Sequence, residues 1–311
     1  MSEREIVCGD LGAAIDDLRG EGFRLDLIYP ADDPHTATLS RDDDCVRVTR
    51  RPDAPLPSDL LPSFESEFVL TSAGALPAQG RAGMLYRDLV PGRLGGRYIA
   101  SHISIPEGGP VSDWVHFHKI QVQMIYVRRG WVRVVYEDQG EPFVMDEGDL
   151  VLQPPQIRHQ VLESSPGLEV IEISSPAVHA TFAEHRFGLP NGMDPSRTFA
   201  GQRFLHHVAA ETPWTAFDGG EAQETAIGEA TGGLAEVRTL RTAGSRAMAF
   251  QPHQGELTFA FVLEGFAILE FRGSHEIGDA DAFVIPPNEP WSIRDASSEF
   301  RLLHVTTARL D

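Results

Sequence analysis

Three histidines near the middle of the chain have the residue type and spacing of a metal site. His116 and His118 are separated by one residue, and side chains two residues apart on a β-strand point to the same face. His159 lies further along, after a Gly-Asp turn, an apolar stretch and a Pro-Pro pair. Imidazole is a common ligand of divalent transition metals, so the three residues predict one bound ion, whereas a lone histidine is more often a hydrogen-bonded core residue.

The histidine pair lies in a segment that resembles motif one of the cupin superfamily, G(X)5HXH(X)3-4E(X)6G. His116, His118, Gln123 and Gly130 fall at the ligand and turn positions of this motif. The segment departs from it in having a glutamine in place of the glutamate and one extra residue after Gly109. The resemblance implies that Gln123 either binds the metal or hydrogen-bonds a water or substrate held there.

The segment that ends in the third histidine resembles cupin motif two, G(X)5PXG(X)2H(X)3N. Gly148, Pro154 and His159 match this motif, whereas Gln156 stands in place of the glycine and Glu163 in place of the asparagine. A His-X-His pair alone is a weak signal. Both motifs in one block make the predicted metal site much more specific.

The expected ligand set describes an electropositive centre. Three neutral imidazoles and the amide of Gln123 would leave the full charge of a divalent ion in place, whereas a carboxylate ligand would reduce it by one unit. Such a centre favours an anionic substrate that chelates through two oxygens, such as an enolate, a carboxylate or a hydroxy acid. The ligand type leaves Fe, Mn, Ni, Zn and Cu open, and the resemblance to three-histidine cupin oxygenases implies Fe(II).

Two more residues are candidates for catalysis beside Gln123. Tyr126 lies within the first motif and is expected to move a proton, and Arg133 on the next strand is expected to clamp a substrate carboxylate. Each has a simpler alternative, because tyrosines pack in cores and arginines are often solvated. Weaker candidates for the cavity or its surroundings are Tyr136, Arg158, Gln121, His102 and Glu163.

The likeness to cupins extends over residues 83–175 and 225–308. It implies a mainly β fold with two antiparallel jelly-roll barrels, that is, a bicupin similar to metal-dependent cupin dioxygenases. Both blocks contain two strands joined by a glycine turn, then a Gly-Asp turn, an apolar strand and a Pro-Pro pair, as expected from duplication. We expect a metal-binding cupin domain over residues 81–185, a linker over 186–224 and a second cupin domain over 225–311.

Residues 1–80 are expected to form a small α+β extension and a linker. Apolar residues at helical spacing predict a helix over residues 10–20. Alternating apolar residues predict three strands, over residues 23–29, 36–39 and 45–49. This order is similar to half of a vicinal-oxygen-chelate module without its metal ligands, so a structural or dimer element is expected. The Pro-rich stretch 52–80 predicts a linker or an arm packed on a neighbour, and a short helix is expected over residues 179–189.

The second cupin block is expected to have lost its metal. Aligning the glycine turns and Pro-Pro pairs of the two blocks identifies four positions that correspond to the first ligand set, and these are Gln251, His253, Thr258 and Trp291. Only His253 keeps a strong ligand, so a structural role in dimerisation or in closing the first cavity is expected. The alternative is a weak independent site formed by His253 and Glu256.

The bulk composition narrows the partners and the location. A net charge of −20 over 311 residues argues against binding to nucleic acid or to anionic membrane surfaces. We see neither a signal peptide nor a membrane-spanning apolar run, so a cytoplasmic protein is expected. Two cysteines, Cys8 and Cys45, are too few for a disulfide scaffold and are expected to be free thiols. The family resemblance implies a homodimer.

The expected function is that of a metal-dependent dioxygenase, an oxidoreductase that binds a small anionic molecule on Fe(II) and uses O2. In this hypothesis Gln123 orients a water, O2 or a substrate oxygen. One alternative is a non-redox lyase or isomerase that acts on a sugar acid or keto acid. The other is a ligand-binding bicupin without turnover.

Overall fold

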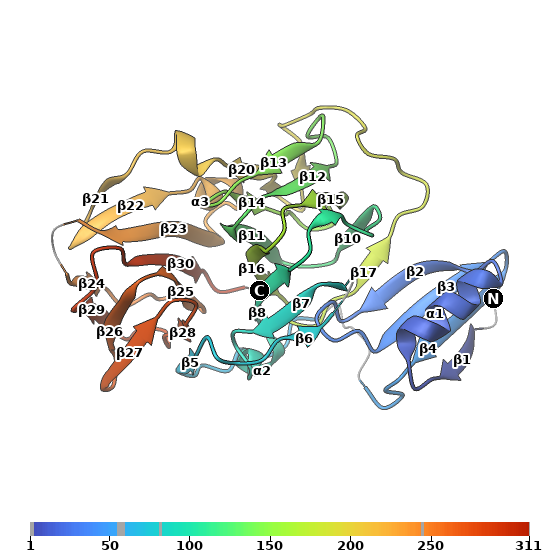
Figure 1. Ribbon diagram of the computed structural model, residues 1–311, viewed down its shortest axis with the longest axis horizontal. Coiled ribbons are helices and arrows are strands. Elements are labelled where there is room, and N and C mark those ends of the chain that lie inside the picture. Colours follow the sequence, from blue (N-terminus) through green and yellow to red (C-terminus); the bar gives the residue numbers. More distant parts are fainter. Residues whose placement is uncertain (1–2, 55–59, 81–82, 244–245, 311) are drawn as a thin grey trace.

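A computed structural model describes residues 3–54, 60–80, 83–243 and 246–310. Figure 1 shows two β-barrels side by side with a small N-terminal module at one end of the molecule. The mainly β fold of two barrels expected from the sequence is confirmed. Within the described residues no helix is both long and apolar enough to cross a bilayer. Cys8 and Cys45 are not joined by a disulfide.

The N-terminal module is a four-stranded sheet covered by one helix. Its elements are β1 (Glu3–Val7), α1 (Leu11–Gly20), β2 (Arg24–Tyr29), β3 (Thr36–Arg41) and β4 (Asp44–Thr49). The carboxylate of Asp10 caps the helix by accepting from the backbone N–H of Ala13 at 3.1 Å. Leu11, Ile15 and Leu18 lie on one helix face and are buried against the sheet. The expected helix and three strands are therefore confirmed, and β1 is an additional strand that pairs in parallel with β4.

The first barrel contains two facing sheets. One sheet continues the N-terminal module, because β2 pairs with β17, and it holds β17 (Thr181–Ala183), β10 (His116–His118), β15 (His159–Ser164), β12 (Val132–Tyr136), β13 (Phe143–Met145) and β9 (Gly109–Pro110). The facing sheet holds β20 (Leu205–His207), β14 (Leu150–Leu152), β11 (Val122–Arg129), β16 (Leu168–Ser175), β8 (Ile99–Ile105), β7 (Leu85–Asp88) and β6 (Ala78–Gln79). The helix expected over residues 179–189 is wrong, since strand pairing across β17 overrides the local helical pattern.

The second barrel repeats this arrangement. Its larger sheet holds β21 (Thr215–Phe217), β22 (Gly220–Glu224), β23 (Ala235–Thr242), β30 (Arg301–Thr307), β25 (Thr258–Glu264), β28 (Ala282–Val284) and β5 (Val69–Thr71). Its smaller sheet holds β24 (Met248–Phe250), β29 (Trp291–Arg294), β26 (Phe266–Glu270) and β27 (Ser274–Gly278). The remaining short elements are α2 (Arg93–Gly96), α3 (Ile227–Ala230), the 3-10 helix η2 (Ala209–Glu211), and the hairpin of β18 (Thr198–Phe199) and β19 (Gln202–Arg203).

Two segments expected as linkers take part in the barrels. From the first, β5 pairs with β28 and so acts as an arm on the second barrel. From residues 186–224, β20 pairs with β14 of the first barrel, and β22 pairs with β23 of the second. The linkers therefore join the barrels through hydrogen-bonded strands.

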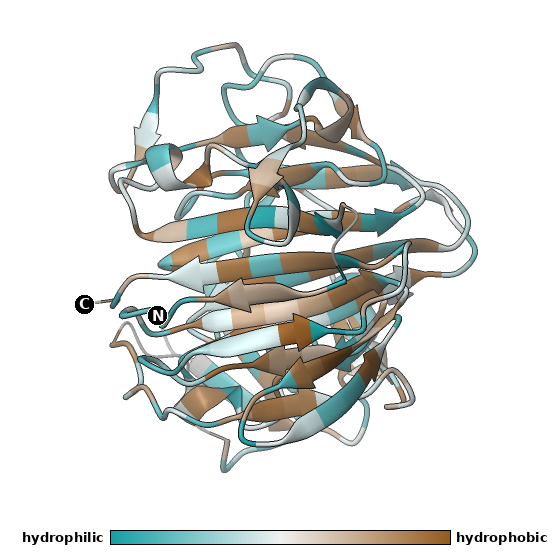
Figure 2. Cartoon of the chain, turned by 90° about the vertical axis from the view of Figure 1, so that its left-hand side faces the viewer, coloured by the Kyte–Doolittle hydropathy of each residue, from teal (hydrophilic) through white to brown (hydrophobic). Residues whose placement is uncertain are grey.

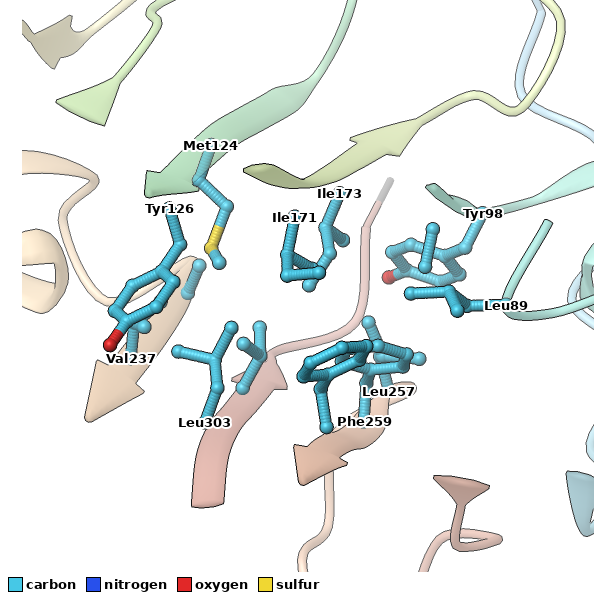
Figure 3. Close-up of a cluster of buried hydrophobic side chains, with 14 of the residues drawn as sticks. Leu89, Tyr98, Met124, Tyr126, Ile171, Ile173, Val237, Leu257, Phe259 and Leu303 are labelled. Atoms are coloured by element: carbon cyan, nitrogen blue, oxygen red, sulfur yellow. The ribbon is translucent and has the colours of Figure 1, made fainter. Parts of the chain in front are cut away.

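The two barrels share an apolar interface built from alternate residues of their strands. Met124 and Tyr126 on β11 face Val237 and Leu303 of the second barrel (Figure 3). Figure 2 shows the alternation of hydrophobic and hydrophilic residues along the strands. Because side chains alternate, Gln123 and Ile125 on the same strand must point into the first barrel. The interface therefore fixes which face of β11 is left for the cavity.

A buried ion pair crosses the same interface. Arg97 donates to both oxygens of Glu256, at 2.9 and 2.8 Å, and the Tyr98 hydroxyl donates to the same carboxylate at 3.1 Å. His253 instead donates from Nε2 to the carbonyl oxygen of Thr307 at 2.7 Å. The suggested weak site of His253 and Glu256 is therefore wrong, because each side chain is engaged elsewhere.

Candidate metal centre

His116, His118 and His159 converge inside the first barrel. His116 lies directly opposite His159 where β10 pairs with β15, and His118 is on the same face of β10 as His116. All three are buried, and one ligand nitrogen from each lies within 4.8 Å of the others. Three imidazole nitrogens this close together could hold one divalent ion between them. In the described part of the chain this is the one such cluster of three or more metal-ligating side chains.

The hydrogen bonds of the three imidazoles prepare them as ligands. Nδ1 of His116 donates to the carbonyl oxygen of Trp114 at 2.7 Å, and Nδ1 of His159 donates to that of Ile157 at 3.1 Å. Nδ1 of His118 donates to the carbonyl of Ala180 at 3.4 Å. A carbonyl oxygen only accepts, so each neutral ring carries its proton on Nδ1 and its lone pair on Nε2. The donor set therefore fits a divalent transition metal, with backbone carbonyls fixing the tautomers.

Two buried side chains pack around the histidines. A carboxylate oxygen of Asp113 lies 3.5 Å from Nδ1 of His116, and its partner oxygen accepts from the backbone N–H of Val161 at 2.9 Å. Tyr136 stacks on His159 with ring centroids 5.4 Å apart. Burial raises the pKa of the Tyr136 hydroxyl, and the charge of Glu172 acts in the same direction. Tyr136 therefore remains a neutral hydroxyl at physiological pH.

Gln123 faces the cavity and is oriented by a carboxylate. Its Nε2 donates to Oε1 of Glu172 on the neighbouring strand β16 at 2.7 Å, and Ser174 donates to the same oxygen at 3.1 Å. A carboxylate only accepts, so this contact fixes which end of the amide points to Glu172 and leaves Oε1 of Gln123 on the other side. Glu172 also lines the cavity, so a carboxylate lies in its wall although none is among the converging ligand atoms.

Gln153 hydrogen-bonds the nitrogen of His159 that would bind an ion. Its Nε2 lies 2.9 Å from Nε2 of His159, which is the acceptor because Nδ1 of that ring carries the proton. Gln153 is buried and lies at the end of β14 in the cavity wall. Its amide must turn away from His159 when a metal binds, which would bring a carbonyl oxygen within reach of the site.

The cavity around these groups has a volume of about 90 Å³ and a mostly apolar wall. Its apolar wall is formed mainly by Met84, Ile103, Ile105, Ile125, Val132, Val134, Met145, Val161, Leu168 and Val170. Ala31 of the N-terminal module also lines it, so this module closes one part of the cavity. Among the described lining residues there is no lysine or arginine. Any anionic ligand would therefore be neutralised by a metal and not by a cationic side chain.

The structure places several sequence-derived candidates outside this cavity. Tyr126 is on the opposite face of β11, in the interface cluster, where burial raises its pKa. Arg133 is exposed, because its neighbours Val132 and Val134 take the inward positions of β12. Arg158 pairs with Glu137 and Glu184 instead. Neither Tyr126 nor Arg133 reaches the three histidines, so we propose no catalytic role for them. Gln121, His102 and Glu163 do not line the cavity either.

Three inward residues were not singled out from the sequence, namely Glu172, Gln153 and Gln160. For Glu172 a signal exists, because it continues the inward alternation of Leu168 and Val170 as an acidic residue in an apolar strand. Gln153 could have been recognised as a polar residue that ends the apolar run of motif two. Tyr136, one of the weaker candidates, does line the cavity.

Among its described residues, the second barrel has no comparable histidine set. Strand pairing places Phe250 opposite Trp291, as His116 is placed opposite His159. The sequence alignment had put Gln251 at the position of His116, and the observed register corrects this by one residue. A one-residue slip is invisible without strand pairing, because it exchanges the two faces of a strand.

Comparison with known proteins identifies the fold. No family model matches the sequence, and no curated protein matches it. Protein Ylba from E. coli superposes with a TM-score of 0.60 at 11% identity, covering 80% of this chain and 93% of that one. Oxalate decarboxylase from Lactobacillus farciminis gives 0.57 at 14% identity, covering 78% and 86%. Salicylate 1,2-dioxygenase from Pseudaminobacter salicylatoxidans gives 0.56 at 16% identity, covering 80% and 86%. The chain therefore has the two-barrel cupin fold, with a three-histidine metal site in its first barrel.

Proposed function

We propose that this protein is a metal-dependent enzyme, an Fe(II)-type dioxygenase that acts on a small anionic chelating substrate. The observation that carries the proposal is the convergence of three imidazoles whose Nε2 lone pairs face one buried cavity. When bound, Fe(II) would accept the oxygens of the substrate and supply the redox chemistry with O2. The structural likeness to a salicylate dioxygenase is consistent with this reaction class.

Charge and size define the substrate class. Glu172 lines the cavity and Asp113 lies 3.5 Å from Nδ1 of His116, so two carboxylates lie near the position of a divalent ion and limit the charge that a ligand must offset. A ligand of low charge, such as an enolate or a hydroxycarboxylate, fits this balance. The cavity of about 90 Å³ restricts the substrate to a small molecule.

The chain's own residues orient such a substrate and keep water out. The amide nitrogen of Gln123 donates to Glu172, whose carboxylate also accepts from Ser174, so the amide oxygen of Gln123 is left to face a ligand. Tyr136 offers a neutral hydroxyl as a hydrogen-bond donor. The apolar wall removes bulk water, which strengthens these electrostatic contacts.

The experiment that tests the proposal combines metal analysis with oxygen uptake. Protein purified without O2 should contain Fe in preference to Zn or Ni, and should consume O2 with some members of a series of β-diketones, catechols and hydroxy acids. The proposal is wrong if the iron-loaded protein consumes no O2 with any of these compounds. We also propose that the protein is a homodimer in the cytoplasm. Light scattering tests the dimer.

A non-redox lyase or isomerase is the second candidate, and the position of Glu172 favours it. The carboxylate of Glu172 in the cavity wall is a group that can take up and return a proton, and Tyr136 in the same wall stays a neutral hydroxyl that can donate a hydrogen bond. Turnover of a sugar acid or keto acid by Zn- or Ni-loaded protein without O2 would favour this reaction. Ligand affinity that survives in a metal-free His159→Ala variant would instead favour a binding protein without turnover.

A further inference from the structure

The second barrel contains its own cavity, at the place that corresponds to the metal centre. Its volume is about 420 Å³. Strand pairing defines the correspondence: Phe250 lies opposite Trp291 where the first barrel has His116 and His159. On the facing sheet, His304 pairs with Ala260 as Glu172 pairs with Ile125 in the first barrel. The second barrel therefore has a cavity at the corresponding place, and different side chains line it.

An aromatic pair replaces two metal ligands in this second cavity. The rings of Phe250 and Trp291 are parallel to within 1° and their centroids are 3.7 Å apart. Neither ring carries a lone pair that binds a transition metal, and His253 is engaged by the carbonyl of Thr307. Trp291 and Phe250 line the cavity and give it an apolar floor.

His304 adds a hydrogen-bond donor above this floor. The Nε–H of Arg238 donates to Nδ1 of His304 at 3.3 Å, so Nδ1 is an acceptor. Burial lowers the pKa of His304 to about 3, and the neutral ring therefore carries its proton on Nε2. His304 is only 6% exposed and lines the cavity, and its Nε2 has no hydrogen-bond partner among the described residues. An unused N–H donor is thus held inside the cavity.

The remaining polar groups exclude charged ligands. Inside, the hydroxyls of Thr258 and Thr306 lie in the wall with His304, and none of these groups carries a charge. Asp218, Glu224 and Glu236 also line the cavity and repel anions, and Glu224 pairs with Arg238 at 3.7 Å. Beside the aromatic rings, the guanidinium of Arg238 and the N–H of His304 are both donors, so a ligand that reaches them needs acceptors, and an ammonium group offers none. A neutral ligand with oxygen acceptors meets neither obstacle.

We propose that the second cavity is a metal-independent binding site for a neutral ring molecule that carries hydroxyl oxygens, of the monosaccharide class. The apolar face of a pyranose ring would rest against the outer ring face that the Phe250–Trp291 stack leaves toward the cavity. Its hydroxyl oxygens would accept from Nε2 of His304 and exchange hydrogen bonds with Thr258 and Thr306. This site lies beyond the proposed dioxygenase reaction and does not depend on it.

A charge series of sugars tests the proposal on the full chain. Saturation-transfer NMR and calorimetry would compare neutral pyranoses (glucose, galactose, mannose and xylose) with glucuronate and glucosamine, at concentrations up to about 10 mM. At least one neutral sugar should bind, and more tightly than both charged counterparts. The absence of binding by every neutral sugar, or preferred binding of a charged one, overturns the proposal.

Three variants locate the site. Thr258→Val keeps the side-chain shape and should weaken neutral-sugar binding about five- to tenfold. His304→Leu removes the donor and should weaken it at least as much. His159→Ala, which removes a metal ligand from the first barrel, should leave sugar binding unchanged. Binding that survives both second-barrel substitutions, or that disappears with His159→Ala, would place the ligand elsewhere and overturn the assignment.

Discussion

Gln123 donates its side-chain amide to Glu172 at 2.7 Å, across the adjacent strands β11 and β16. This contact supplies the site with the carboxylate that its first motif lacks. The carboxylate lies instead on the neighbouring strand β16, and it holds the amide of Gln123 in one orientation. Glu172 is not among the ligand atoms that converge within 4.8 Å, so its role in this geometry is to orient Gln123.

The first prediction concerns a variant that places a second carboxylate in this pair. In a Gln123→Glu variant without metal, two carboxylates would face each other and share a proton, which raises the pKa of the pair. A raised folded-state pKa stabilises the fold at low pH, and this stability is lost as the pH rises. The melting temperature of the variant should therefore fall relative to the wild type between about pH 5 and 8.

The reciprocal variant is its control. The double substitution Gln123→Glu with Glu172→Gln keeps one amide and one carboxylate, so the pH-dependent loss should disappear. Equal pH profiles for the single variant and the wild type would show that the two side chains do not interact in solution.

Removing one imidazole should remove the metal. In His159→Ala, two histidines remain on β10, and two ligands hold a divalent ion far more weakly than three. Elemental analysis after dialysis should give about one ion per chain for the wild type and almost none for the variant. His275→Ala, on β27 of the second barrel, is the matched control and should keep its metal. Full metal content in His159→Ala would refute the three-histidine site.

The Tyr136→Phe variant tests the role of the hydroxyl, because it removes the hydroxyl and keeps the aromatic ring. The variant keeps the aromatic stack on His159, so metal content should be unchanged. Loss of one hydrogen bond to the substrate should raise KM or lower kcat by about tenfold. Tyr126→Phe on the interface face of β11 is the comparison, and its activity should equal that of the wild type. An effect of Tyr126→Phe equal to that of Tyr136→Phe would contradict the placement of the two phenols.

Acid should destabilise the fold through Glu169, which pairs with His102 and Arg128 of the same barrel. Hydrogen bonding to His102, and then the charge of Arg128, lower the pKa of Glu169 from 4.5 to about 2. A depressed pKa stabilises the fold above pH 4.5, and this stability is lost as the pH falls toward 2, with a total of about 3 kcal/mol. Denaturant unfolding from pH 7 to pH 2 should show this loss.

The Glu169→Gln variant isolates that contribution. It should be less stable than the wild type at pH 7, and its stability should change less between pH 4.5 and 2. Glu276→Gln removes an exposed carboxylate from the second barrel and should unfold with the wild-type pH dependence. A Glu169→Gln profile that parallels the wild type would contradict the assignment.

The sequence by itself determined the class of fold and the three histidines that converge in the first barrel. Both follow from local rules, since alternation fixes which residues of a strand share a face, and His116, His118 and His159 stand in two recognisable motifs. The helix α1 was also predictable, because its apolar spacing and Asp10 cap are local features.

Only the tertiary structure decided which face of each strand looks into the cavity. Tyr126 and Tyr136 both lie in apolar strand segments, yet Tyr126 faces the second barrel and Tyr136 stacks on His159. The same applies to Phe250, whose register against Trp291 is one residue away from the aligned position. Strand register and barrel packing depend on residues far apart in the chain, and a shift of one residue exchanges inside and outside.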